Sequence, residues 1–148
     1  MKQLLACAAV ALLAVGCNRD GGGNPTDPSQ VTIEFTVTDL IVGTGTAAAV
    51  GNSVTVHYTG WLYNPSGPES KGTQFDTSFD GDPPLPVAPL GTANILPGFQ
   101  QAVVGMRVGG RRRAYIPASL AYGSSGSSNG AIPPNAAVVF EIELVSVQ

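Results

Sequence analysis

The chain has 148 residues, of which 43% are hydrophobic and only 11% are charged, and its net charge at neutral pH is -3. About 118 residues remain for a folded domain once an N-terminal leader is set aside, and such a domain buries roughly two-thirds of its unfolded surface. A core of that size needs neither a metal nor a disulfide, and the acidic balance argues against nucleic acid as a partner.

The first residues predict an export signal. Lys2 supplies positive charge, an apolar run extends from Leu4 to Val15, and small residues precede Cys17. This run is too short to span a bilayer, which takes about 20 residues. Leu13 to Cys17 resembles a bacterial lipobox, so we expect residues 1–16 to be a signal peptide and Cys17 to be lipidated. The alternative is an unmodified Cys17 within an ordinary signal peptide.

The next segment, residues 18–30, predicts a flexible tether. It contains Gly21 to Gly23, Pro25 and Pro28 among polar residues and shows no apolar periodicity. Both cysteines of the chain precede this segment, so the exported domain contains no thiol. Together these features predict a protein that is exported and anchored by lipid to a bacterial membrane, facing the periplasm or the cell exterior.

Residues 31–148 predict a single domain that consists mainly of strands. Apolar and polar residues alternate in three segments, which is typical of half-buried strands of an antiparallel sheet. The alternating apolar residues are Ile33, Phe35 and Val37, then Val54, Val56 and Tyr58, and finally Phe140, Ile142 and Leu144. A further strand ends at Ala114 to Pro117.

One segment has helical spacing instead. Phe99, Ala102, Val103 and Met106 recur at helical intervals, after Pro97-Gly98 and before Gly109-Gly110, which predicts a short amphipathic helix. Glycine- and proline-rich composition predicts loops at residues 64–73 and 123–134. The expected fold is therefore α+β, with an antiparallel sheet wrapped around one short helix.

Arg111, Arg112 and Arg113 form the only basic cluster of the chain. They lie in a segment with strand character, where neighbouring side chains point to opposite faces. We therefore expect a solvated strand face, and the alternative is a phosphate-binding patch.

A set of separated blocks, in this order and at these intervals, resembles the FKBP-type peptidyl-prolyl isomerases across residues 31–148. The blocks are Val56 to Gly60, Phe75-Asp76, Ile95 to Phe99, Ala121 to Gly123, Ile132 to Pro134 and Val139 to Leu144. The resemblance implies a five- to six-stranded half-barrel with its ligand site between sheet and helix. It also implies isomerisation of Xaa-Pro bonds without a cofactor, proline-containing polypeptides as substrates, macrolides as possible inhibitors, and a monomer.

The residue types present agree with a reaction that needs no nucleophile. The domain has one histidine and no cysteine, and the chain has no HExxH, GxSxG, Walker or CxxC motif. His57 falls on the strand face opposite Tyr58, so we expect a structural histidine and no metal site. Rotation about an Xaa-Pro bond requires only that the twisted amide be stabilised, and a dry apolar pocket favours it because twisting removes charge separation.

The resemblance assigns the site residue by residue. Tyr58, Asp76, Phe99 and Tyr122 form the catalytic set, with Phe99 as the floor of the pocket. The walls would be formed by Tyr58, Phe75, Ile95, Leu96, Tyr122, Ile132 and Phe140, and the backbone N–H of Leu96 would donate to a substrate carbonyl. From the residues alone, Asp76 is equally a turn-forming aspartate, and a core role is the stronger interpretation for the aromatic residues Tyr58, Phe75, Phe99 and Phe140.

The chain departs from the family pattern at two places. The family usually has tryptophan where Phe99 stands, and often has two phenylalanines where this chain has Leu85 to Leu90. Val87 is the residue that we assign to the pocket rim in this segment. The alternative function is a noncatalytic module that binds proline-containing segments, or a holdase chaperone.

Overall fold

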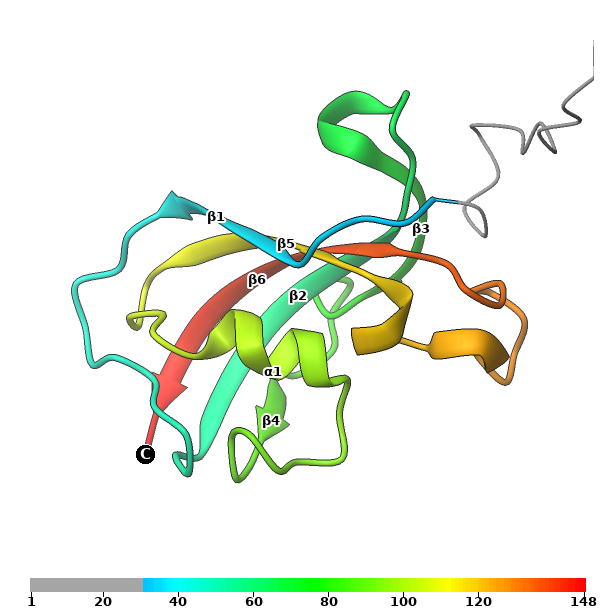
Figure 1. Cartoon of the computed structure of the whole chain (residues 1–148). Coiled ribbons are helices and arrows are strands. Elements are labelled where there is room, and N and C mark those ends of the chain that lie inside the picture. The colour runs from blue at the N-terminus through cyan, green and yellow to red at the C-terminus, as the bar shows by residue number, and fades with distance from the viewer. Residues whose placement is uncertain (1–30) are drawn as a thin grey trace, which may run out of the picture.

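The computed structural model describes residues 31–148, so the predicted signal peptide, Cys17 and the 18–30 tether lie outside the described residues. A six-stranded antiparallel sheet curves over one short helix (Figure 1). This confirms the predicted fold class. The strands are β1 (Thr36–Ile41), β2 (Val54–Tyr63), β3 (Lys71–Thr77), β4 (Leu85–Val87), β5 (Arg111–Ile116) and β6 (Val138–Val147). The helix is α1 (Pro97–Val103), and short 3-10 turns lie at η1 (Pro68–Ser70), η2 (Ala118–Leu120) and η3 (Gly123–Ser125).

The long strands β2 and β6 form the middle of the sheet. The strand order is β1-β5-β6-β2-β3, and β4 also pairs with β2. Strands β3 and β4 share one edge of β2, since Gly60 pairs with Asp76 and Val56 pairs with Leu85. This arrangement brings residues from distant parts of the chain onto the concave face that covers α1.

The alternation predicted for β2 and β6 places their apolar residues in the core. Val54 and Val56 are 2% and 0% exposed, and Ile142 and Leu144 are 0% and 1% exposed. They belong to the same buried cluster as Ala102 and Val103 of α1. Sheet and helix therefore share one core, and the period-2 pattern marks its sheet side.

Helix α1 contains most of the residues predicted for it but ends earlier than the spacing indicates. It closes at Val103, and Met106 lies beyond it while remaining buried at 3% exposure. Gly105, with φ of +82°, follows the helix, a conformation that glycine adopts without strain. The apolar period thus continues through a turn after the helix has ended.

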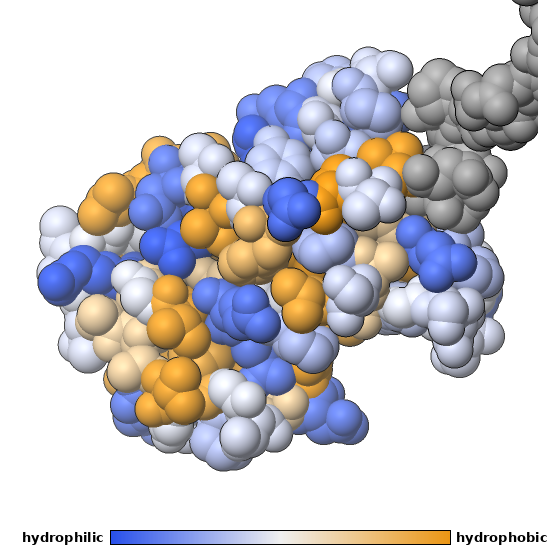
Figure 2. Space-filling view, viewed as in Figure 1, coloured by the Kyte–Doolittle hydropathy of each residue, from blue (hydrophilic) through white to orange (hydrophobic). Residues whose placement is uncertain are grey.

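The first strand differs from its prediction. β1 begins at Thr36, after Ile33 and Phe35, and all six of its residues are exposed, including Val37 at 39%. The reason is its position, because β1 lies at the edge of the sheet and pairs only with β5. Figure 2 shows hydrophobic side chains scattered among polar ones over this part of the molecule.

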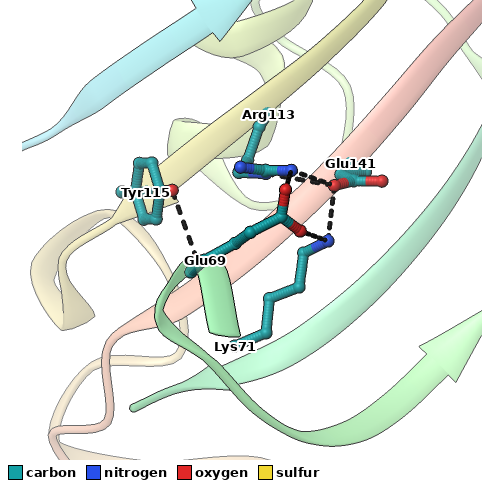
Figure 3. A network of polar contacts seen from close by, with 5 residues as sticks. All are labelled: Glu69, Lys71, Arg113, Tyr115 and Glu141. Carbon is teal, nitrogen blue, oxygen red and sulfur yellow. Dashed lines mark hydrogen bonds and ion pairs between the residues drawn. The ribbon is translucent and has the colours of Figure 1, made fainter. Parts of the chain in front are cut away.

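The predicted loop over residues 64–73 is shorter than expected, because β3 already begins at Lys71. Ion pairs and a cation–π contact hold the side chain of Lys71 in place. Its Nζ lies 2.6 Å from Glu141 Oε1 and 2.7 Å from Glu69 Oε2, and 4.4 Å above the Trp61 ring. Figure 3 shows Glu69 reaching from the η1 turn into this network. Long-range ion pairs therefore extend a strand into a segment whose composition indicates a loop.

The arginines of β5 do not form the solvated face that we expect from the sequence. Arg113 lies in the same network, 2.8 Å from Glu141 Oε1 (Figure 3). On the other face, Arg112 pairs with Asp39 and donates to the carbonyls of Ala102 and Val104 at the end of α1. Their side chains are only 11% and 13% exposed, because each has carboxylate or carbonyl acceptors around it.

His57 lies on the outer face of β2, opposite Tyr58. Its Nδ1 is 3.0 Å from Ser78 Oγ, and its ring stacks on Phe79 with centroids 4.9 Å apart. Within residues 31–148 no group of three or more metal-ligating side chains occurs, and no helix there is long and apolar enough to cross a membrane.

Candidate active site

A cavity of about 80 Å³ lies between the concave face of the sheet and the start of α1. Its lining comes from β2, β3, β4, the loop before α1, α1 itself, the segment after η2 and β6. The lining residues are Tyr58, Asp76, Leu85, Ile95, Leu96, Phe99, Tyr122 and Phe140. The fold thus brings together all four residues of the expected catalytic set, which are up to 64 positions apart in the chain (122 minus 58).

Aromatic rings packed edge to face form the base of this cavity. Phe99, only 2% exposed, meets Phe140 at a centroid distance of 5.2 Å and Tyr58 at 5.7 Å, with interplanar angles of 90° and 85°. Such geometry is favourable for aromatic quadrupoles and holds each ring in place. Phe99 is therefore both a buried core residue and the floor of the cavity, so the core role and the pocket role considered from the sequence both apply to it.

Phe75 and Ile132 lie outside the lining, although the resemblance assigns both to the walls. Phe75 packs against Phe140 and Tyr122, with centroids 5.6 Å and 6.3 Å away. Ile132 is 3% exposed within the core cluster. Phe75 therefore contacts two rings that line the cavity, and Ile132 belongs to the core.

At β4 the rim residue is Leu85 and not Val87. Val87 is fully buried and pairs with Val54, whereas Leu85 is partly exposed and faces the cavity. Sequence reasoning found the right segment but the wrong residue. The register against β2 decides the orientation, and a three-residue strand shows no alternation from which to read it.

Gly60 explains how two aromatic rings can pack so closely over β2. A Cβ at this position would lie 2.7 Å from ring atoms of both Phe75 and Phe140. Both distances are well below normal carbon contacts, so any larger residue would displace the rings. The sequence block contains this glycine, but its role is visible only in the packing.

Two hydroxyls and one carboxylate supply the polarity of the cavity. The Tyr58 hydroxyl donates to Asp76 Oδ2 at 2.7 Å. Burial raises the pKa of Tyr58, and the bond to the Asp76 carboxylate raises it further. Burial and the charge of Asp76 likewise raise the pKa of Tyr122. Both tyrosines therefore stay neutral and can donate hydrogen bonds at ordinary pH.

Asp76 does not act as a turn former. It lies within β3 opposite Gly60, while Thr77 Oγ1 accepts from Phe79 N at 3.2 Å and Ser78 Oγ accepts from Tyr58 N at 2.9 Å. The neighbouring hydroxyl residues thus make the side-chain bonds to the backbone, one of them local and one across to β2, and Asp76 lines the cavity.

Gln100, which sequence reasoning missed, holds the loop that forms the remaining wall. Its Oε1 accepts from the N–H groups of Gly91 and Ala93 at 2.8 Å and 3.2 Å, and its Nε2 donates to the carbonyls of Ala93 and Ile95 at 2.8 Å and 2.9 Å. The residue is only 5% exposed. A polar residue on the buried side of a predicted helix is the signal that could have identified it.

The same loop presents a backbone donor. Among the hydrogen bonds of residues 31–148, the N–H of Leu96 has no acceptor, whereas that of Ile95 donates to Ala93 O at 2.8 Å. Leu96 also lines the cavity. The site therefore offers an apolar floor, a free amide donor, neutral hydroxyls and one carboxylate, and no cysteine or histidine lines it.

A sheet closed over a short helix, with an aromatic cavity between them, defines an FKBP-like domain. A solved peptidyl-prolyl cis-trans isomerase from Pseudomonas syringae superposes with a TM-score of 0.62 at 32% identity, over 77% of this chain and 75% of that one. An FK506-binding protein of Neisseria meningitidis serogroup B is 41% identical over 111 residues, which are 75% of this chain and 94% of the relative.

A peptidyl-prolyl cis-trans isomerase of Saccharomyces cerevisiae is 44% identical over 101 residues, which are 68% of this chain and 69% of the relative. The model of the FKBP-type peptidyl-prolyl cis-trans isomerase family matches residues 44–145. The chain therefore belongs to the FKBP-type peptidyl-prolyl cis-trans isomerases, a family of enzymes.

Proposed function

We propose that the cavity over Phe99 binds the prolyl ring of exported polypeptides and accelerates rotation about the preceding peptide bond. The observation that carries this proposal is the small aromatic cavity, with the Tyr58–Asp76 pair on one wall and the free Leu96 N–H on another. A saturated five-membered ring fits an apolar space of this size, and the polar groups lie where the flanking backbone would pass.

The physics of the reaction explains why such a site suffices. The barrier of about 18–20 kcal/mol comes from amide resonance, which places negative charge on oxygen and positive character on nitrogen. Twisting the bond removes both, so the transition state is less polar than the ground state. An apolar surrounding such as that of Phe99 and Phe140 therefore favours the twisted form over the planar one.

The polar groups of the cavity hold the substrate backbone in place while the Xaa-Pro bond rotates. The Leu96 N–H and the Tyr122 hydroxyl donate to substrate carbonyls, and Asp76 keeps the Tyr58 hydroxyl oriented. Shortening a step of about 100 s to about 10 ms needs a factor of about 10⁴, or roughly 5.5 kcal/mol. Differential binding of the twisted amide can supply this energy without proton transfer or a covalent intermediate.

A protease-free assay on a peptide with one Xaa-Pro bond tests the proposal. We expect acceleration by the native protein and a loss of about 10- to 100-fold in kcat/KM for Asp76→Ala and for Tyr122→Phe, since each removes a polar group from the cavity. Matched controls are Asp80→Ala and Tyr63→Phe, which change the same residue types outside the lining. An uncatalysed rate with the folded native protein, or equal rates in site and control variants, would contradict it.

We propose further that the domain is anchored by lipid on Cys17 after removal of residues 1–16, and that it works as a monomer on the outer side of a bacterial membrane. The support is the sequence pattern of a signal peptide, lipobox and tether. Because relatives are named FK506-binding proteins, we also propose that macrolides compete for the Phe99 cavity. The smaller phenylalanine, which has no indole N–H, should weaken that binding relative to a tryptophan floor.

A further inference from the structure

Tyr58 lies at a gap between the two strands that share one edge of β2. Strand β4 pairs with the first part of β2 and β3 pairs with its last part (Figure 1). The nearest pairs on either side of the gap are Val56 with Leu85 and Thr59 with Thr77. Neither strand therefore pairs with Tyr58. Because a backbone N–H or C=O group inside the protein needs a partner, another group must replace the missing strand there.

Ser78, the residue that follows β3, fills this gap. Its backbone N–H donates to the Tyr58 carbonyl at 2.9 Å, and its Oγ accepts from the Tyr58 N–H at 2.9 Å. One residue thus satisfies both backbone groups of Tyr58, the carbonyl with its main chain and the N–H with its side chain. Ser78 is only 5% exposed, so little solvent reaches these bonds.

A histidine on the outer face of the sheet contacts the same hydroxyl. His57 Nδ1 lies 3.0 Å from Ser78 Oγ. His57 and Tyr58 are neighbours on β2, and their side chains point to opposite faces of the sheet. Ser78 therefore links an imidazole on the outer face to the backbone of the residue whose hydroxyl donates to Asp76 in the cavity at 2.7 Å.

The Ser78 hydroxyl has two possible arrangements, which depend on the charge of His57. When the imidazole is neutral, Nδ1 accepts the hydroxyl proton and the lone pairs of Oγ remain for the Tyr58 N–H. When the imidazole is charged, both ring nitrogens carry protons, so Nδ1 donates to Oγ and competes with the Tyr58 N–H. The hydroxyl proton then turns to the Tyr58 carbonyl, which lies 3.4 Å from Oγ. Protonation of His57 therefore weakens the bond that holds the Tyr58 N–H.

The surroundings of His57 contain charges of both signs. Strand pairing places Glu143 of β6 opposite His57, and Arg111 of β5 opposite Glu143. The His57 ring stacks on Phe79 with centroids 4.9 Å apart, and the Arg111 guanidinium lies 5.7 Å from the centre of the Phe79 ring. Asp80 follows Phe79 in the loop after β3. A charged imidazole would therefore share this region with two carboxylates and one guanidinium group.

We infer that Ser78 is a positioning residue of the isomerase site, and that its hydroxyl couples the protonation of His57 to Tyr58. The inference rests on the proposed function of the cavity and adds regulation of the same site by pH. Neutral His57 leaves Tyr58 firmly held, and charged His57 loosens it. The enzyme therefore turns over substrate faster when His57 is neutral than when it is charged.

A blocked peptide with one Ala-Pro bond and no ionisable group tests this inference with the native protein. Isomerisation is measured by exchange NMR between about pH 5.5 and about pH 8, the range in which histidine ordinarily changes charge. His57 is the single histidine of the chain. We expect kcat/KM to be about two- to threefold lower at the acid end. His57→Asn retains a hydrogen-bonding group near the position of Nδ1 but does not titrate, so its profile should be flat.

Ser78→Ala removes the link itself. At about pH 8 its kcat/KM should be about three- to tenfold below the native value, and its pH dependence should disappear. Ser78→Thr, which keeps a hydroxyl, should retain the native rate and the native pH dependence. The matched control is Ser146→Ala, which removes another hydroxyl partner of β2, since Ser146 Oγ lies 2.6 Å from Thr55 Oγ1. This control should behave like the native protein.

The amide NMR signals of Tyr58 and Ser78 provide a second measurement, which does not depend on turnover. In the native protein both should shift with the same midpoint as the ring protons of His57, and in His57→Asn they should not shift. The native and His57→Asn profiles decide the inference even if Ser78→Ala does not fold.

A native rate that does not change with pH, a pH step that persists in His57→Asn, or native activity in folded Ser78→Ala overturns the inference while leaving the isomerase intact. If the folded native protein turns over the peptide at no pH, the proposed function itself fails.

Discussion

Gln100 shows how one buried amide can organise a functional loop. Its two acceptor and two donor bonds match the pattern of the backbone around it, and the loop it holds carries Ile95 and Leu96. A carboxylate could accept from the Gly91 and Ala93 N–H groups but would face two carbonyls, and an aliphatic residue could make none of the four bonds. The amide is therefore the group that satisfies this loop completely.

We expect Gln100→Leu to lower the free energy of unfolding by about 2 kcal/mol, because backbone groups of the loop lose their partners. The isomerase kcat/KM should fall as well, since the Leu96 N–H is no longer held in place. Urea unfolding and the peptide assay measure the two effects. Gln101→Leu, at the exposed neighbouring position, should change stability by less than about 0.5 kcal/mol. Equal effects of the two substitutions would count against this role for Gln100.

Gly60 gives a second prediction about a single residue. The packing at this position requires that there be no side chain. We expect Gly60→Ala to cost about 1–3 kcal/mol of stability, since its methyl group would push the Phe75 and Phe140 rings apart. The displaced Phe140 would also reshape the cavity and reduce turnover. Thermal unfolding and the peptide assay check this, and a stable, fully active variant would show that the rings can move without loss.

At the scale of elements, charged side chains hold the outer face of the sheet together. Lys71 of β3, Arg113 of β5 and Glu141 of β6 meet Glu69 of the η1 turn, so one network joins three strands and a connection (Figure 3). Burial opposes the charged form of Glu141, but the bonds from Lys71 and Arg113 outweigh it and lower its pKa. The network depends on this carboxylate remaining ionised.

The lowered pKa predicts the direction of the pH dependence. Between the folded and unfolded pKa values of Glu141 the unfolded state binds more protons, so stability rises with pH. The contribution is fully present above the unfolded value of about 4.3 and is lost as the pH falls through the folded value. Glu141→Gln should therefore lower stability at pH 7 by about 2 kcal/mol and weaken the fall in stability below about pH 4.

Urea unfolding at a series of pH values measures this effect. The control is Glu143→Gln on the same face of β6, because Glu143 has no ion pair among residues 31–148. The control should keep the native pH profile. Identical profiles for the native protein and Glu141→Gln would show that the network does not govern acid stability.

For the whole molecule, the proposed lipid anchor determines where the enzyme works. In detergent phase partitioning of protein expressed in a bacterium, we expect the native chain in the detergent phase and Cys17→Ser in the aqueous phase. Several acyl chains hold a protein firmly, while an unlipidated domain has no such attachment. Cys7→Ser, within the apolar run, should partition like the native chain. A native protein found in the aqueous phase would contradict lipidation.

The sequence by itself determined the fold class, the members of the central strands and the residues around which the cavity forms. Apolar residues alternate with polar ones in the central strands because one face of each strand belongs to the core that includes α1. The period of two in the sequence therefore predicts the buried residues, which are Val54, Val56, Ile142 and Leu144. The family blocks likewise identified Tyr58, Asp76, Phe99 and Tyr122, which the fold brings together.

Only the tertiary structure decided the exposure of β1, the early start of β3 and the partners of the β5 arginines, because each depends on neighbours far away in the chain. The same holds for the hydrogen bonds of the Gln100 side chain and for the close approach of the Phe75 and Phe140 rings at Gly60. The local sequence indicates which residues favour burial. Strand register, long-range ion pairs and side-chain packing between distant segments are determined only when the strands pair.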